Sequence, residues 1–457
     1  MKASVIILAA GQGQRMKSNI PKPLHKIAGV PMVEQVITSV KASGQIDNLY
    51  LVIGHQGDLV REAVSQAFSD INFVVQAEQL GTGHAVDQCR ELLKDFKGTV
   101  LVTYADTPLF RPETFQQLLD YHKEQELAAT VITAQIDDPT GYGRIVRGDD
   151  GYIKKIVEQK DATTEELQIT EINTGTYCFD SELLFKYLAH VTPDNAQAEY
   201  YLPDVLPLMI ANGYRVGAYC IADPQESMGI NDRVQLAKAE EIMRQRICVE
   251  HMLAGVTIIN PSQTYIEQGC QIGSDTIIYP NTYIQKGTIV GSNCIIGPNV
   301  RLTKAVLADN IQIEQAVVVE SSIGENTVVG PFAYIRPGSE IGANCKVGDF
   351  VEIKNTSVGD RSKVPHHSYI GDAEIGSGVN IGCGTITCNY DGKKKSKTVI
   401  QDNSFIGSNT SLVAPVTVGA GAYVAAGSTI TEDVPAGSLG IARARQVNKL
   451  GWKKTEG

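Results

Sequence analysis

The chain has 457 residues and carries 40 Lys and Arg against 51 Asp and Glu, which gives a formal net charge of −11. This length favours two or three domains over a single core. The acidic balance argues against nucleic-acid binding, and no apolar run is long enough to span a membrane. Nine cysteines without paired spacing, and a first segment without the layout of a signal peptide, favour a cytoplasmic protein with reduced thiols.

The first half of the chain alternates predicted strands and helices. Apolar runs that are typical of buried strands lie at 4–10, 49–54, 73–76 and 99–104. Segments with helical character lie at 32–43, 59–67, 84–93 and 112–125. This alternation predicts an α/β domain with a mostly parallel sheet and helices on both faces. The ligands of such sheets bind at the carboxyl ends of the strands.

A glycine-rich loop follows the first predicted strand and contains Gly11, Gly13 and Arg15. Such loops can bind phosphates through backbone N–H groups, but this pair of glycines is neither a complete dinucleotide fingerprint nor a P-loop. Arg15 and Lys22, which stands between two prolines, could neutralise a triphosphate. Taken alone, the segment is better explained as a tight turn with a solvated arginine and lysine beside it.

A helix is expected at 232–253, with Asn231 as its N-cap. Its apolar residues recur every three to four positions, which predicts that one face packs on a neighbouring element. This helix separates the α/β half from a second half of different character.

The second half repeats a branched aliphatic residue every six positions, through 266–296, 323–353 and 400–430, and glycine often follows it. A period of six would spread these residues around a helix, and a plain strand needs no glycine beside them. The pattern therefore predicts a solenoid of short straight runs and corners that begins near Ile258, although a β-rich domain with regular turns is the simpler alternative. The repeat breaks at 388–397, where a loop should leave the solenoid, and an irregular tail is expected from Arg443.

Two further features of the solenoid indicate chemistry. It contains two histidines, His366 and His367, and imidazole suits a base that ionises near neutral pH, although a histidine is more often structural. Arg336 and Lys354 stand 18 residues apart, about one three-sided turn, so both could bind one phosphate. A charged stripe on a solvated face is the alternative.

Several motifs resemble known families. The hexapeptide pattern resembles the left-handed parallel β-helices of hexapeptide acyltransferases. The segments 8–16 and 21–24 resemble the signature of Rossmann-like sugar-1-phosphate nucleotidyltransferases. The subgroup that makes UDP-N-acetylglucosamine is matched by Glu158 and by the stretches 76–85, 141–146, 171–175 and 229–231. As a whole, the chain is similar to bacterial bifunctional enzymes that join glucosamine-1-phosphate N-acetyltransferase and N-acetylglucosamine-1-phosphate uridylyltransferase activities.

For the first domain, the resemblance implies transfer of UMP from UTP to N-acetylglucosamine-1-phosphate, with pyrophosphate released and no covalent intermediate. Mg²⁺ would be held by Asp106 and Asn231. Ala105 stands where the family generally has glycine, so its methyl group could crowd the sugar. The residues implied to bind UTP and UDP-N-acetylglucosamine are Leu8, Ala9, Ala10, Gly11, Arg15, Lys22, Gln76, Gly81, Thr82, Tyr104, Asp106, Gly143, Glu158, Asn173 and Asn231.

For the second domain, the resemblance implies acetylation of glucosamine-1-phosphate by acetyl-CoA, with His366 as the base. Glucosamine-1-phosphate would be bound by Arg336, Lys354, Tyr369 and Asn380. Acetyl-CoA would contact Cys383, Asn389, Tyr390, Ser408, Ala426 and Arg443. Pro365, His367 and Cys383 depart from the family pattern, which leaves the two histidines open to an exchange of roles. The loop at 389–397 would reach a neighbouring subunit of a homotrimer, with its lysines near the CoA phosphates.

The predicted division is a uridylyltransferase domain at 1–229, a linker helix at 230–249 and an acetyltransferase domain with its tail at 250–457. Two alternatives remain open. The solenoid could be a scaffold for a single-activity nucleotidyltransferase, although a scaffold has no need of Arg336, Lys354, His366 and Tyr369 together. It could also resemble the γ-carbonic anhydrases, but these need three converging histidines for Zn²⁺, and the solenoid has an adjacent pair.

Overall fold

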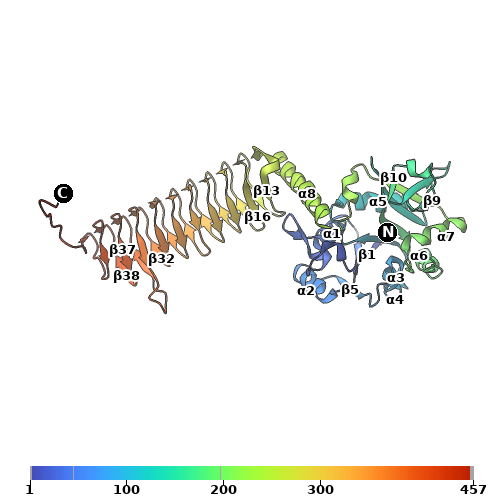
Figure 1. The fold of residues 1–457 in the computed structure, drawn as a ribbon, viewed down its shortest axis with the longest axis horizontal. Coiled ribbons are helices and arrows are strands. Elements are labelled where there is room, and N and C mark those ends of the chain that lie inside the picture. Colours follow the sequence, from blue (N-terminus) through green and yellow to red (C-terminus); the bar gives the residue numbers. More distant parts are fainter. Residues whose placement is uncertain (1–2, 45, 196, 453–457) are drawn as a thin grey trace, which may run out of the picture. The chain divides into compact units, whose positions relative to one another are not determined.

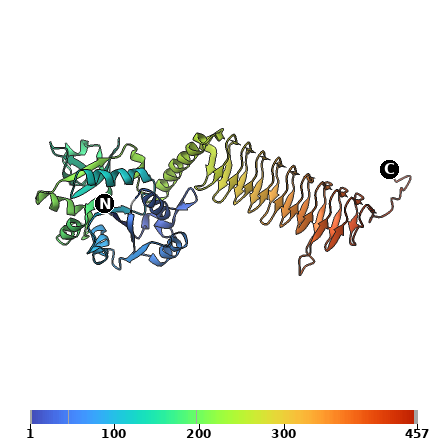
Figure 2. The same cartoon turned by 180° about the vertical axis from the view of Figure 1, so that it is seen from behind.

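The computed structural model describes residues 3–44, 46–195 and 197–452. The chain forms two compact units, Met1–Met243 and Arg244–Gly457, and the division falls inside helix α8 (Arg233–Leu253). The first unit is a layered α/β structure and the second is a β-solenoid (Figures 1 and 2). None of the helices in the described parts of the chain combines the length and apolar character needed to cross a bilayer. The nine cysteines carry free thiols in this structure.

The first unit is built on a sheet with the order β11-β7-β10-β6-β1-β4-β5. Its strands are β1 (Ala3–Ala9), β4 (Ile46–Ile53), β5 (Asn72–Val75), β6 (Thr99–Tyr104), β7 (Ala129–Gln135), β10 (Glu171–Asp180) and β11 (Val216–Cys220). In addition, β8 (Arg144–Arg147) pairs with β10, and β9 (Ile153–Val157) pairs with β8. The predicted parallel strands are confirmed, because β1 pairs in parallel with β4 and β6, and β4 with β5. Strand β10 runs antiparallel to both of its neighbours, which the local sequence pattern did not indicate.

Helices cover both faces of this sheet, as the alternating pattern predicts. Every residue of β1 is buried, and successive residues face opposite sides of the sheet. Ile6 and Leu8 belong to the hydrophobic core on one face, and Val5 and Ile7 belong to the core on the other face. The helices on the first face are α3 (Thr82–Asp87), α4 (Arg90–Leu93), α6 (Ser181–Leu188) and α7 (Val205–Ala211). Those on the second face are α1 (Met32–Ala42), α2 (Gly57–Ala67) and α5 (Pro112–Glu124).

The prediction that Asn231 is the N-cap of α8 is wrong. The helix begins at Arg233, so the capping position belongs to Asp232. The carboxylate of Asp232 accepts hydrogen bonds from the backbone N–H groups of Val234 and Gln235, both at 2.9 Å, and therefore caps the helix. The side chain of Asn231 turns instead toward the glycine-rich loop. The packed helical face is confirmed, because Ala239 and Ile247 are buried.

The second unit consists of three parallel sheets whose strands follow one another around the solenoid, from β12 (Thr257–Ile258) to β41 (Leu439–Gly440). Each strand pairs with its equivalent in the next coil; for example, β15 (Ile277–Ile278) pairs with β18 (Ile295–Ile296). The repeat residues Ile278 and Ile296 are buried, whereas Ile295 beside the latter is exposed. This confirms that the six-residue repeat marks the side chains that fill the interior.

One coil is longer than the others. Lys363 of β30 (Lys363–His366) pairs with Asn380 of β33 (Asn380–Ile381), and Asn380 pairs in turn with the much later Phe405 of β36 (Phe405–Ile406). The additional residues form a loop between β34 (Ile386–Cys388) and β35 (Thr398–Ile400), which projects from the solenoid in Figure 1. The predicted loop is therefore confirmed. The expected irregular tail is also seen after Arg443 up to residue 452, and its last part, 453–457, lies outside the described residues.

Candidate active sites

The glycine-rich loop of the first unit follows β1 and packs on Lys22. Gly13 has a φ of 63°, and a Cβ atom placed on it would lie 2.7 Å from the Cβ of Lys22. A residue with a side chain would therefore be strained and would displace the lysine stem. Beside the Gly11 Cα, by contrast, the space is open to 4 Å. The loop thus holds Lys22 closely and leaves room for a ligand above the buried residues Leu8, Ala9 and Ala10.

The ammonium group of Lys22 bridges two oxygen-bearing side chains. It forms an ion pair with the carboxylate of Asp106 and donates a hydrogen bond to Asn231 Oδ1 at 2.8 Å. Arg15 donates to the same Asn231 oxygen at 2.9 Å. Because one cation contacts both oxygens, the two predicted metal ligands lie within reach of a single ion. In the described part of the chain no group of three or more His, Cys, Asp or Glu side chains is placed to hold a metal, so this pair would need oxygens from a substrate.

The residues predicted to bind uracil are held by contacts on the same edge of the sheet. Gln76 follows β5 and donates to the carbonyl of Gly81 at 3.1 Å. The hydroxyl of Thr82 accepts from the backbone N–H of Leu202 at 3.0 Å, and Gly83 donates to the carbonyl of Tyr200 at 2.7 Å. The loop around Gly81 is thereby attached to the segment at 200–202. Gly11, Gln76 and Asp106 each follow the carboxyl end of a parallel strand, where ligands of such sheets bind.

The residues predicted to bind the sugar lie beside one another. The backbone N–H of Asn173 donates to the carbonyl of Gly143 at 2.9 Å, and its amide donates to the hydroxyl of Tyr177 at 3.0 Å. A Cβ on Gly143 would lie 3.0 Å from an oxygen of Glu158, which shows how close these two residues are. Burial raises the pKa of Glu158, with further contributions from Asp161 and Asp204. Burial also raises the pKa of Tyr104 well above its ordinary value.

The concern about Ala105 is not supported by its position. Its backbone N–H donates to the carbonyl of Leu8 at 3.0 Å, which continues the alternation of β6 past Tyr104. The methyl group of Ala105 is consequently buried, at 1% exposure, in the core beside α1 and α5, whereas Tyr104 packs on the opposite core. The expectation that this methyl group crowds the sugar is therefore wrong.

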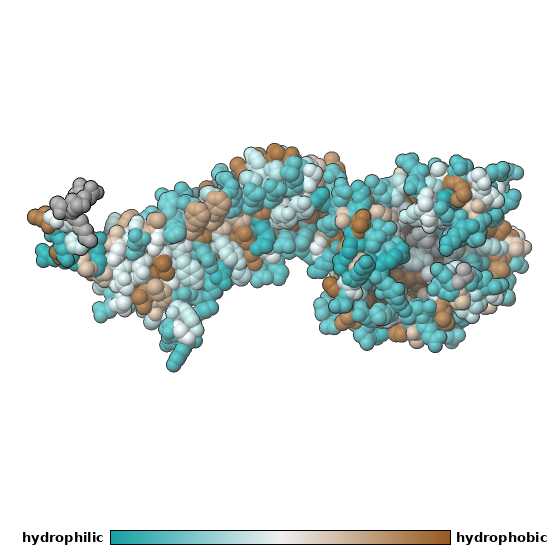
Figure 3. Space-filling model, in the orientation of Figure 1, coloured by the Kyte–Doolittle hydropathy of each residue, from teal (hydrophilic) through white to brown (hydrophobic). Residues whose placement is uncertain are grey.

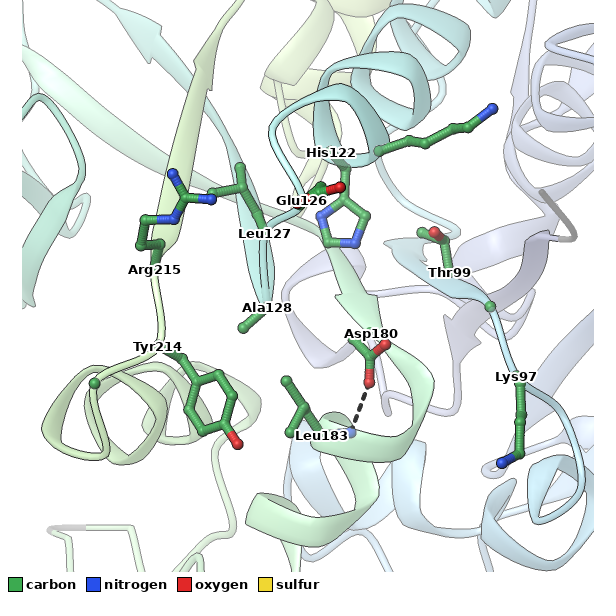
Figure 4. A pocket seen from close by; sticks show the side chains of 13 residues that line it. Lys97, Thr99, His122, Glu126, Leu127, Ala128, Asp180, Leu183, Tyr214 and Arg215 are labelled. Carbon is green, nitrogen blue, oxygen red and sulfur yellow. Dashed lines mark hydrogen bonds between the residues drawn. The ribbon is translucent and has the colours of Figure 1, made fainter.

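A cavity of about 590 Å³ lies at the opposite edge of the sheet, where β6 and β7 begin and β10 ends (Figure 4). None of the predicted site residues lines it. Its polar groups are used within the fold: Asp180 caps α6 by accepting from the N–H of Leu183 at 2.9 Å, and Arg215 donates to the carbonyl of Gln125 at 3.0 Å. Burial lowers the pKa of His122 to about 4, so this ring is neutral near pH 7. The cavity is separate from the candidate site.

In the solenoid, the predicted phosphate ligands are brought together by successive coils. The backbone N–H of Arg336 donates to Ile353 at 2.8 Å, which places Arg336 beside Lys354 as the spacing of 18 predicts. Arg336 pairs with Glu352 at 2.7 Å, and Lys354 contacts both carboxylate oxygens of Asp372 at 3.1 Å. Arg336 and Lys354 therefore lie on neighbouring coils as a cationic cluster, in which each cation also has an acidic neighbour.

Lys395 completes this cluster and was not predicted as part of it. Its side chain extends from the projecting loop and lies against Lys354, which lowers the pKa of Lys395. Asn389, at the base of the same loop, donates to Asp372 and, at 3.5 Å, to the hydroxyl of Tyr369. Adjacent ammonium groups repel unless an anion lies between them, so the cluster is suited to a phosphate. The only signal for this contact in the sequence is the lysine-rich loop, whose lysines we predicted to lie near the CoA phosphates.

His366 lies at a corner of the solenoid that continues into the predicted acetyl-CoA residues. The carbonyl of His367 accepts from Gly384 at 3.0 Å, so this corner lies next to Cys383 in the following coil. Three further hydrogen bonds continue this corner from coil to coil. The backbone N–H of Asn409 donates to the carbonyl of Cys383, and that of Gly427 donates to the carbonyl of Ser408. The Arg443 guanidinium donates to the carbonyl of Ala426 at 2.6 Å. Cys383, Ser408, Ala426 and Arg443 thus form one exposed row with His366 near its start.

Two predicted residues stand apart from these groups. Asn380 lies in β33, within the sheet that contains β30. Lys354 and Tyr369 belong to the sheet of β28 (Glu352–Lys354) and β31 (Tyr369–Gly371), and Arg336 directly follows β25 (Tyr334–Ile335) of the same sheet. Tyr390 is exposed on the projecting loop, where its hydroxyl donates to the carbonyl of Gly392 at 2.7 Å. Asn389 lies with the cationic cluster and away from the exposed row.

Comparison with known proteins assigns both units. Residues 4–224 match the family described as nucleotidyl transferase, and 269–304, 320–355 and 397–432 match the bacterial transferase hexapeptide (six repeats). A curated protein of Brevibacillus brevis named Bifunctional protein GlmU is 52% identical over 99% of this chain and 97% of its own length. Proteins of the same name from Acetivibrio thermocellus and Clostridium beijerinckii are 52% and 50% identical, over 98% and 100% of this chain and 96% and 99% of their own lengths.

Among solved structures, a UDP-glucose pyrophosphorylase in complex with UDP-glucose is similar to this chain with a TM-score of 0.44 and 18% identity, over 54% of this chain and 100% of that one. The assignment rests on the curated relatives and the two family matches.

Proposed function

This chain belongs to the family of bifunctional GlmU proteins, and from that premise we propose how its residues divide the synthesis of UDP-N-acetylglucosamine. The chain is a two-activity enzyme with a nucleotidyltransferase domain and a left-handed β-helical acetyltransferase domain. The second acetylates glucosamine-1-phosphate, and the first transfers UMP from UTP to the product and releases pyrophosphate. These reactions provide precursors of peptidoglycan and lipopolysaccharide. The domain boundaries predicted at 229 and 250 flank the division at Met243, and we retain them as a proposal.

In the first site, the glycine-rich loop and the cations beside it bind the triphosphate of UTP. Arg15 and Lys22 lie next to the open space at Gly11, where both can neutralise phosphate charge. The oxygens of Asp106 and Asn231 would hold Mg²⁺, with phosphate oxygens as further ligands, and the ion would neutralise charge on the transferring group. The sugar phosphate is held by the residues around Gly143, Glu158 and Asn173. Its oxygen attacks the α-phosphorus in line, and pyrophosphate leaves.

The second site combines an amine substrate, a thioester and a base. The single observation that carries this proposal is the corner at which His366 begins the exposed row of acetyl-CoA residues, one corner before Tyr369 and its cationic cluster. Arg336, Lys354 and Lys395 bind the phosphate of glucosamine-1-phosphate. His366 takes a proton from the amine as the amine attacks the thioester, and Ser408, Ala426 and Arg443 bind the cofactor along the row.

We also propose that the solenoid forms a homotrimer. Apolar side chains remain exposed on its outer faces, including the stacked pairs Phe332–Phe350 and Phe405–Tyr423. Figure 3 shows apolar patches along this unit among hydrophilic residues. Contiguous exposed apolar surface is typical of interaction sites. Sedimentation equilibrium of the full chain should give three times the chain mass of 49.3 kDa, and a monomer would contradict the proposal.

The proposed division is tested by following all intermediates in one reaction. The enzyme is incubated with glucosamine-1-phosphate, acetyl-CoA, UTP and Mg²⁺, and masses are recorded over time. N-acetylglucosamine-1-phosphate should appear first and then be converted to UDP-N-acetylglucosamine. Omission of acetyl-CoA should stop both products, and omission of UTP should leave the acetylated sugar phosphate to accumulate. Direct formation of UDP-glucosamine at a comparable rate would contradict this order.

A further inference from the structure

His366 has a partner that the sequence did not indicate. Its ring nitrogen Nδ1 lies 2.7 Å from the carboxylate of Asp349, and the two residues are direct register partners in the neighbouring strands β27 (Lys346–Asp349) and β30. A second hydrogen bond joins the two coils at the same position, because the backbone N–H of His367 donates to the carbonyl of Asp349 at 2.8 Å. The hydrogen bond from His366 lowers the pKa of Asp349, with a smaller contribution from Lys346.

The backbone around this pair is unusually close. A Cβ atom on Gly348 would lie 1.8 Å from the carbonyl oxygen of Pro365, so only glycine allows the two coils to approach here. The ring of Pro365 fixes φ in the residue directly before His366. The close approach at Gly348 and the pairing of β27 with β30 place Asp349 and His366 opposite one another across the coils.

We propose that Asp349 is a positioning residue for acetyl transfer, acting through His366; this inference rests on the role proposed for His366 above. A carboxylate accepts but cannot donate, so it selects the neutral imidazole form that carries its proton on Nδ1. The other ring nitrogen, Nε2, is then unprotonated and free to act as the base. Without Asp349 the ring can rotate, and the neutral form with the proton on Nε2 becomes available.

Asp349 and His366 together serve the proton transfer that accompanies acetyl transfer. The neutral amine of glucosamine-1-phosphate forms a C–N bond to the thioester carbon, and the C–S bond breaks with the electron pair leaving on the CoA sulfur. The proton lost by the nitrogen goes to Nε2 of His366. The imidazolium is stabilised by the Asp349 carboxylate and can return the proton to the thiolate.

The test compares Asp349→Ala, Asp349→Glu and the control Glu340→Gln, a change of an exposed acidic residue in another strand of the solenoid. In the full-length enzyme, Asp349→Ala should lower kcat for acetyl transfer roughly 10- to 100-fold, as for other groups that orient a reacting ligand, while KM for glucosamine-1-phosphate stays within about twofold. Asp349→Glu should restore most of kcat. The control should leave kcat unchanged, and uridylyl transfer should be normal in every variant.

A spectroscopic measurement separates positioning from a merely structural role. The ¹⁵N resonances of the His366 ring, assigned by comparison with His366→Ala, should show the proton on Nδ1 in the wild type and a mixture of the two neutral forms in Asp349→Ala. Unchanged resonances, or a full kcat in Asp349→Ala, would overturn the inference. If His366→Ala itself retains acetyl transfer, the proposed function of His366 fails; if only Asp349→Ala is unaffected, the positioning role alone fails.

Discussion

Replacement of Asp106 by asparagine is expected to reduce uridylyl transfer by roughly 10³-fold or more, because a metal ion contributes several kcal/mol of charge stabilisation to such a reaction. An amide oxygen is a weak ligand for Mg²⁺, and Asn231 alone would then hold the ion. The substitution also removes the ion pair with Lys22. Release of pyrophosphate from UTP, measured at several Mg²⁺ concentrations, gives the rate.

Acetyl transfer should be unchanged in Asp106→Asn, because that site lies in the other unit and has no metal in the proposed mechanism. The matched control is Asp149→Asn, which alters an exposed residue in the turn between β8 and β9 and should leave both activities normal. If Asp106→Asn lost both activities while remaining folded, the two sites would not be independent. A normal rate of uridylyl transfer would exclude Asp106 as a metal ligand.

Replacement of His366 by alanine should reduce acetyl transfer by roughly 10²–10⁴-fold, the usual contribution of a general base. The amine of glucosamine-1-phosphate is largely protonated near neutral pH and must lose a proton before it can attack. The described part of the solenoid offers imidazole only at His366 and His367. Thiol release from acetyl-CoA, followed across pH, measures the effect.

The control for this experiment is His367→Ala. His367 has a φ of 41° at the corner of the coil, and its backbone N–H, which the substitution retains, is the group that contacts Asp349. Both activities should therefore stay near normal. A normal rate in His366→Ala with a loss in His367→Ala would reverse the two roles. Normal rates in both variants would exclude the histidine mechanism.

The architecture could be predicted from the sequence because its signals are local and periodic. The buried strand at β1 and the six-residue repeat each depend on side chains that face a core at regular intervals. The break at 388–397 likewise predicted the projecting loop. The antiparallel direction of β10 could not be predicted from a local pattern, because it depends on pairing with β6, which is distant in the sequence.

The arrangement of the candidate-site residues could be predicted where the sequence spacing fixes it, and less so where coils must be aligned. Arg336 and Lys354 are neighbours because the spacing of 18 equals one turn at that point. Asp349 and His366 are separated by a slightly shorter turn, and Lys395 reaches Lys354 from the projecting loop, so no fixed period identifies either contact. The cap at Asp232 was not predicted because asparagine and aspartate are equally good N-caps. Only the fold shows that the side chain of Asn231 accepts hydrogen bonds from Arg15 and Lys22 instead.

The bridge formed by Lys22 gives the first site a built-in counter-ion. With Lys22 between Asp106 and Asn231, the charge of the Asp106 carboxylate is already neutralised and the Asn231 oxygen already accepts a hydrogen bond before any ligand arrives. If these oxygens hold a divalent metal as proposed, its entry would exchange one cation for another, and the displaced ammonium could turn toward the phosphates of the nucleotide. A nucleotide that attracts Lys22 likewise uncovers the metal ligands. Under the proposed roles of these residues, metal and nucleotide binding would therefore be thermodynamically linked, and each would strengthen the other by the same factor.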